Sequence, residues 1–287
     1  MPRQFSDDDM RRRIMLGKKA LEITCYVLGA GAFSVFIRWL QLMLGFTDGL
    51  ADATVFNILV PLMAIVSGFV FLRFVDKFRN DRWYVPEDFY TALYNPGKLY
   101  TAVRWAIGGV MALGGVVLLI SSETDKNADF YRVLALLALV TGVTFPLVLS
   151  SANKPHVAAR KTVCFISVIP IIFFCWWLVT VYKVNSNNPV VWQYGPEALA
   201  VIVSIIAFFR VAGFPFGTAN AWRSVFFNML ASAVDIMMLA DTRYIGQQMM
   251  FLAAAGMLTL YNWVLITNLL QRPKPVREQP NDGFERL

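Results

Sequence analysis

The chain alternates long apolar runs with short polar segments. Eight runs are long enough to cross a membrane: 20–46, 54–74, 101–120, 131–151, 162–182, 197–213, 222–240 and 246–270. A membrane-spanning helix needs about 20 mostly apolar residues, whereas a barrel strand needs about 10 that alternate. The runs do not alternate, so the pattern predicts an all-α fold, a polytopic transmembrane helix bundle with about eight spans. The first partner that it implies is the lipid bilayer.

Three segments differ in composition from these runs. Residues 1–19 mix acids with bases and predict a polar cytoplasmic segment, and residues 272–287 have too little apolar content to fold alone, which predicts a disordered cytoplasmic tail. Between them, 20–271 form one transmembrane helical domain. Its longest loop, 77–100, combines charged and aromatic residues, which suits the cytoplasmic headgroup level. The turn signals around this loop predict a short interfacial helix at 86–94.

The basic residues are distributed unevenly between the two sides of the predicted bundle. Most of the 26 Lys and Arg residues fall on the N-terminal segment, on the alternate loops that share its side, and on the C-terminal tail. Because Lys and Arg accumulate on cytoplasmic segments, this asymmetry predicts a multi-pass protein of the cell membrane with both termini cytoplasmic. No N-x-S/T sequon occurs on a predicted outer loop, which favours a bacterial protein.

Composition excludes several other classes of function. The net charge of +7 does not indicate nucleic-acid binding, because the basic residues are scattered over loops and helix ends. The three cysteines, Cys25, Cys164 and Cys175, lie in or beside apolar runs without Cys-x-x-Cys spacing, so we expect them to pack as small apolar side chains. The chain carries no metalloprotease, serine-hydrolase or phosphate-loop motif. We therefore expect no cofactor, and an enzymatic function is not favoured.

The run at 222–240 contains a single carboxylate, Asp235. A charged acid inside a membrane helix costs about 2.5–3.5 kcal/mol on insertion scales, so the side chain must face protein or water and either find a partner or take up a proton. Asp235 lies six residues before Asp241, roughly 9 Å below the outer interface, and Arg38 in the first run lies at a similar depth. The count predicts a buried Arg38–Asp235 ion pair; a protonated Asp235 bonded to a neighbour is the alternative.

A second group of charges is expected at the inner leaflet. Glu22 is predicted near the depth of Arg104, Lys161 and Arg210, so we expect one ion pair there, although the sequence does not choose the partner. Such a cluster can also hold an anionic lipid headgroup. An intramembrane carboxylate pair would need a second buried acid, and none is evident. Pro196 and Glu197 are assigned to the first turn of the sixth span.

Two further patterns concern packing. The third span carries a series of small residues, namely Gly108, Gly109, Ala112, Gly114 and Gly115, which allow close approach between helix backbones. The last two spans carry Met237, Met238, Met249 and Met250 on either side of their connecting turn. Clustered thioethers favour Cu(I), which makes these residues a weak copper candidate, but methionine is also a common gap-filler between helices. No other metal site is predicted.

Three functions fit these patterns. The first is small-solute or ion-coupled transport, with Asp235, Arg38 and the prolines Pro61, Pro146 and Pro170 near the pathway. The second is a non-catalytic membrane scaffold or sensor that binds a cytoplasmic protein through loop 77–100. The third is a membrane-embedded lipid enzyme. Water access to Asp235 separates the first function from the second, because only a pathway must be wetted.

Overall fold

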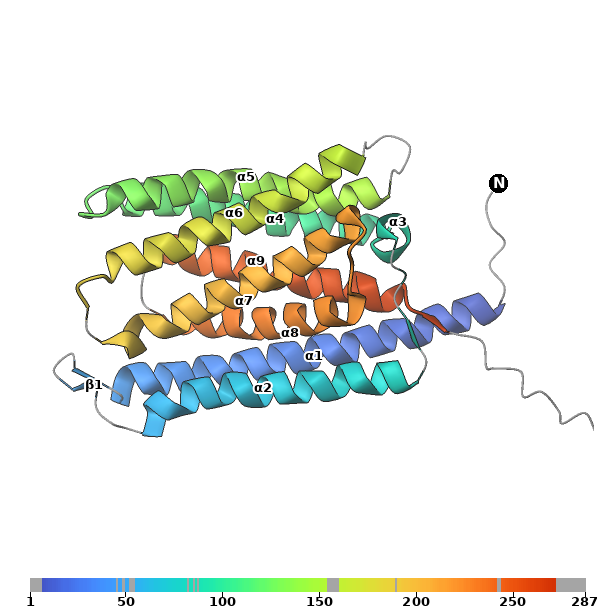
Figure 1. The fold of residues 1–287 in the computed structure, drawn as a ribbon, viewed down its shortest axis with the longest axis horizontal. Helices are drawn as coiled ribbons and strands as arrows, with labels where there is room; N and C mark the ends of the chain where they lie inside the picture. Colours follow the sequence, from blue (N-terminus) through green and yellow to red (C-terminus); the bar gives the residue numbers. More distant parts are fainter. Residues whose placement is uncertain are drawn as a thin grey trace, which may run out of the picture.

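Eight long antiparallel helices form the structure, a computed structural model that describes residues 7–44, 46–47, 50–51, 55–81, 83–84, 86, 88–153, 160–188, 190–241 and 244–271 (Figure 1). The long helices are α1 (Asp7–Leu44), α2 (Val55–Asn80), α4 (Lys98–Ser121), α5 (Ala128–Ala152), α6 (Arg160–Val184), α7 (Val191–Phe216), α8 (Ala221–Met237) and α9 (Ile245–Thr267). Within the described residues, these eight segments are long and apolar enough to span a membrane, α8 together with the short helix η1 (Met238–Ala240) that continues it. The predicted all-α transmembrane bundle is confirmed.

The bundle has two ends, which we name by what they hold. The termini end is where α1 begins and α9 ends, and the Arg38 end is where α1 ends and α9 begins. Two pairs of two-residue strands lie outside the long helices. Strand β1 (Phe46–Thr47) pairs with β2 (Leu50–Ala51) between α1 and α2, and β3 (Trp83–Tyr84) pairs with β4 (Leu270–Gln271) at the termini end.

Helices α8 and α9 occupy the middle of the bundle. Helix α8 packs against α1, α2, α7 and α9, whereas α9 packs against α4 and α1 as well as α8 (Figure 1). Helices α5 and α6 lie on the side away from α1 and α2, where α5 packs against α4 and α6 packs against α7. A polar side chain on the inner face of α8 is therefore surrounded by protein.

Several helices begin or end outside the predicted spans. Helix α1 starts at Asp7 instead of near residue 20, α2 continues to Asn80, and α7 starts at Val191 instead of Glu197. An apolar run marks only the part of a helix that suits lipid, whereas backbone hydrogen bonding continues past it into polar sequence. The predicted polar segment 1–19 is thus helical from Asp7. The predicted tail 272–287 lies outside the described residues.

The small-residue face of the third span packs as predicted. A Cβ atom on Gly142 of α5 would lie 2.6 Å from the carbonyl oxygen of Gly108 on α4, and a Cβ on Gly246 of α9 would lie 2.6 Å from the carbonyl oxygen of Gly114. Neither position has room for a side chain, so glycine lets the three backbones approach closely. Gly109 differs, because nothing lies within 4 Å of the position its Cβ would take.

Loop 77–100 folds onto the termini end of the bundle. Its helix, α3 (Phe89–Ala92), is a single turn, shorter than the predicted 86–94; it begins after Asp88, whose carboxylate accepts a hydrogen bond from the Thr91 backbone N–H at 3.2 Å. Trp83 and Phe89 are buried in the protein. The aromatic side chains therefore contribute to the bundle core, which the composition of the loop alone did not reveal.

Candidate functional site

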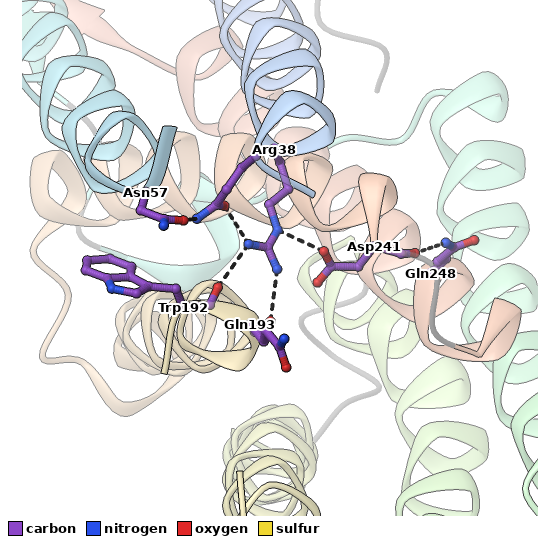
Figure 2. Close-up of polar contacts among 7 residues, drawn as sticks. Arg38, Asn57, Trp192, Gln193, Asp241 and Gln248 are labelled. Atoms are coloured by element: carbon purple, nitrogen blue, oxygen red, sulfur yellow. Dashed lines mark hydrogen bonds and ion pairs between the residues drawn. The ribbon is translucent and has the colours of Figure 1, made fainter. Parts of the chain in front are cut away.

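The Arg38 side chain is the centre of a buried hydrogen-bond network at the Arg38 end (Figure 2). The residue is 0% exposed. Its Nε donates to Asp241 Oδ1 at 2.8 Å, its Nη1 donates to Gln41 Oε1 at 2.6 Å and to the Trp192 carbonyl at 3.2 Å, and its Nη2 donates to the Gln193 carbonyl at 3.0 Å. The guanidinium thus joins α1 to α7 and to the segment between η1 and α9.

The sequence explains why these acceptors are available. In an α-helix the Trp192 carbonyl would accept from the N–H four residues later, but that residue is Pro196, which has no N–H. The carbonyl is therefore free to accept from Arg38. Gln41, one turn after Arg38, extends the network to α2, because its Nε2 donates to Asn57 Oδ1 at 2.8 Å.

The predicted partner of Arg38 is wrong. Arg38 pairs with Asp241, and Asp235 bonds elsewhere. The sequence-based count compared the depths of backbone positions, whereas the long Arg38 side chain extends toward the end of the bundle. At that level it meets Asp241, which directly follows η1; Gln248 Nε2 in turn donates to the Asp241 carbonyl (Figure 2).

Asp235 lies deeper, on the inner face of α8, and is 0% exposed. Both of its carboxylate oxygens lie 2.9 Å from the hydroxyl oxygen of Ser204 on α7. Among the described residues, no Lys or Arg lies within ion-pair distance of this carboxylate. Asp235 is therefore bonded to a polar neighbour, as the alternative from the sequence expected. That its carboxyl group is protonated stays a prediction.

A further buried acid, Glu197, was missed from the sequence. It is 1% exposed, and its Oε1 accepts from Trp177 Nε1 at 3.0 Å and from Gln247 Nε2 at 3.5 Å. Because α7 begins at Val191, Glu197 lies inside the helix and not at its first turn. Its spacing of seven residues from Ser204, two helical turns on one face, was the available signal.

The inner face of α8 carries four buried polar residues, which we call the α8 polar seam: Ser224, Asn228, Ser232 and Asp235. At about 100° per residue, Ser224, Asn228 and Asp235 fall within roughly 40° of one another. Ser224 and Asp235 both bond to α7, whereas Ser232 bonds to the Ala255 carbonyl of α9 at 3.2 Å. The seam therefore follows the groove between α7 and α9.

Asn228 is the unusual member of the α8 polar seam. The residue is completely buried, yet neither its Nδ2 nor its Oδ1 has a hydrogen-bond partner. Asn262 on α9, which donates to the Val225 carbonyl at 3.3 Å, also has a buried Oδ1 without a partner. Buried amides of this kind are usually satisfied by water or a ligand. Asn228 lies about 10 Å from Asp235 along α8, toward the termini end.

The predicted inner-leaflet cluster does not assemble. Glu22 is exposed on α1, Lys161 is exposed at the start of α6, and Arg210 on α7 is partly buried. Arg104 is buried in α4, on the other side of α9 from α1. Among the described residues, no ion pair joins Glu22 to any of these cations. The prediction compared only the depths of these residues in the membrane. Residues at the same depth need not lie on helix faces that contact each other.

The methionines pack in the helix interfaces. Met237, Met238 and Met250 are buried, and Met250 lies against Gly114 where α9 meets α4. Within the described part of the chain, no group of three or more His, Cys, Asp or Glu side chains is placed to hold a metal ion.

Comparison with known proteins gives no match to a protein-family model, to a curated protein or to a solved structure. The function must therefore be argued from the site.

Proposed function

We propose that the protein is an ion-coupled membrane transporter in which Asp235 takes up and releases a proton. The observation that carries this proposal is the burial of Asp235 between α7 and α8, where a serine hydroxyl is its hydrogen-bond partner. Ionisable groups inside membrane helices are expensive to bury and commonly belong to proton relays or substrate pathways.

Ser204 suits a carboxyl group that changes its protonation state. A hydroxyl donates a hydrogen bond to a carboxylate and accepts one from a carboxylic acid. Asp235 therefore keeps its bond to Ser204 in both states. An arginine partner would instead place an opposite charge against the carboxylate, as Arg38 does at Asp241, where the two side chains are 2.8 Å apart.

Polar groups extend from Asp235 toward both ends of the bundle. Glu197 and Gln247 lie toward the Arg38 end, and Asn228 and Asn262 lie toward the termini end. The unsatisfied amide of Asn228 is suited to bind water, which would carry protons between Asp235 and the termini end. We further propose that this end is cytoplasmic, as the distribution of Lys and Arg predicts.

The scaffold alternative gains less support. It requires the aromatic residues of loop 77–100 to be available to a partner, but Trp83, Phe89 and Leu93 are buried against the bundle. Only Tyr94 and Leu99 of its large apolar side chains are well exposed in the described part of the loop.

Water access to Asp235 tests the proposed pathway. Asp235→Cys is introduced after Cys25, Cys164 and Cys175 are replaced by serine, and membrane-impermeant thiol reagents are added to either side of sealed vesicles under imposed pH gradients. We expect labelling from at least one side. Ala254→Cys, at a buried position on α9 outside the α8 polar seam, is the matched control and should stay unlabelled. Equal protection of both cysteines from both sides would contradict the proposal.

A further inference from the structure

A small cavity opens at the termini end among α4, α5 and α9. Its polar lining is Asn95, Tyr100 and Arg104, and its apolar lining includes Leu149 of α5 with Leu260 and Val264 of α9. The cavity is separate from the α8 polar seam, because its polar side chains come from α4 and from the segment that precedes it.

Arg104 is a buried cation with an unused donor. The residue is 7% exposed, its Nη2 donates to Thr101 Oγ1 at 3.1 Å, and its buried Nε has no acceptor. None of the ion pairs among the described residues includes it. A buried charge of this kind is stabilised only when an anion or several hydrogen-bond acceptors reach it.

The start of α4, on the N-terminal side of Thr101, adds three more donors. The N-cap residue, Gly97, has no side chain to satisfy the first N–H groups, and the first helical bond runs from Thr101 N–H to the Gly97 carbonyl at 3.1 Å. The N–H groups of residues 98–100 therefore have no acceptor within the helix. The bond to Thr101 shows that the Arg104 guanidinium points back toward these groups.

We propose that Arg104 and the start of α4 bind a phosphate group. Guanidinium groups and helix N-termini are both favourable ligands for phosphate oxygens. Two sources share this chemistry, an anionic phospholipid headgroup and free phosphate. The surface beside the site favours the lipid, because Leu99 is 74% exposed and Val103 and Trp105 also face outward from α4, where they can contact an acyl chain.

The two sources are separated by reconstitution in nanodiscs. Thermal unfolding is measured in phosphatidylcholine alone, in phosphatidylcholine with phosphatidylglycerol, and in phosphatidylcholine with inorganic phosphate. We expect phosphatidylglycerol to raise the Tm of the wild-type protein and native mass spectrometry to retain one such lipid. A rise with inorganic phosphate as well would support the site and identify free phosphate as a ligand.

Two variants and one control make the test specific. Arg104→Gln should weaken retention of phosphatidylglycerol about tenfold and abolish the rise in Tm. If this variant folds poorly, Thr101→Asp serves instead, because its carboxylate would pair with Arg104 within the chain and remove the response to lipid while preserving the fold. Arg132→Gln, at an exposed site near the Arg38 end, should respond like the wild type. The proposal is overturned if Arg104→Gln and Thr101→Asp both respond to phosphatidylglycerol as strongly as the wild type does, or if the wild type responds to neither anion.

Discussion

Arg38 and Asp235 are both completely buried charged residues of one bundle, but their surroundings differ. Arg38 donates four hydrogen bonds, and an opposite charge lies 2.8 Å away on Asp241. Asp235 has one neutral hydroxyl as its partner. The first arrangement pairs opposite charges and connects helices, whereas the second leaves the carboxyl group without a counterion among the described residues, as the proposed proton exchange requires. Burial is therefore the same for both residues, and their hydrogen-bond partners are what differ.

The largest effect is expected from breaking the Arg38–Asp241 pair. Arg38→Gln or Asp241→Asn each leaves the other charge buried without its counterion, and we expect a loss of about 3–5 kcal/mol in the free energy of unfolding. The measurement is reversible unfolding in detergent micelles. The double variant should lose much less than the sum of the single variants, whereas Arg38→Gln and Asp235→Asn should combine additively. Additivity for Arg38 and Asp241 would show that the two residues are not coupled.

A smaller loss is expected at Gln41, which connects the Arg38 network to α2. Gln41→Leu removes the Oε1 acceptor of Arg38 and the Nε2 donor to Asn57. We expect a loss of about 1–3 kcal/mol in the same unfolding assay, because Arg38 and Asn57 each lose one buried hydrogen bond. Gln248→Leu is the control that touches the network only through the Asp241 backbone. An equal loss in both variants would mean that the connection to α2 contributes little.

Asp235→Asn should change the free energy of unfolding by no more than about 1 kcal/mol, because the amide keeps the shape of the side chain and its bond to Ser204. Proton uptake is expected to respond far more strongly. Proteoliposomes with a trapped pH-sensitive dye should show solute-driven proton movement for wild-type protein and none for Asp235→Asn. Asp129→Asn, at an exposed residue, is the control. Unfolding as severe as that of Arg38→Gln would instead assign Asp235 a structural role.

The smallest effect concerns a titratable pair outside the membrane-spanning helices, which contrasts with both buried charges. Tyr244 donates to Asp125 Oδ2 at 2.6 Å; this bond lowers the pKa of Asp125 and raises the pKa of Tyr244 to about 12. The contribution of Asp125 to the stability of the folded protein is present above the usual pKa of an aspartate. It is lost as the pH falls through the lowered pKa of Asp125. The contribution of Tyr244 is present below its usual pKa near 10 and is lost as pH rises through about 12.

We therefore expect the stability difference between wild type and Tyr244→Phe to be constant near neutral pH and to shrink at both extremes. Its size should stay below about 1 kcal/mol, because the pair is partly exposed. Tm measured against pH provides the test. A difference that grows in acid would contradict the direction of the Asp125 shift.

The sequence predicted the fold better than the site. The eight spans and the close contacts of Gly108 and Gly114 follow from side-chain composition, because lipid requires apolar runs and close packing requires small residues. The partner of Arg38 depended on the direction of a long side chain, and the burial of Glu197 depended on where α7 begins. Counting residues from the end of a span gives neither the direction of a side chain nor the residue at which a helix begins. The predicted cluster of Glu22 and Arg104 failed for a related reason, because depth does not specify the helix face.

The central claim is that Asp235 exchanges a proton while it remains inside the bundle. Infrared difference spectroscopy of reconstituted protein tests it most directly, because a protonated carboxyl group has its own C=O stretching band. The band assigned to Asp235, absent from Asp235→Asn and retained in Asp129→Asn, should disappear reversibly as the pH is raised. A band of constant intensity at every pH, or no such band at any pH, would contradict the claim.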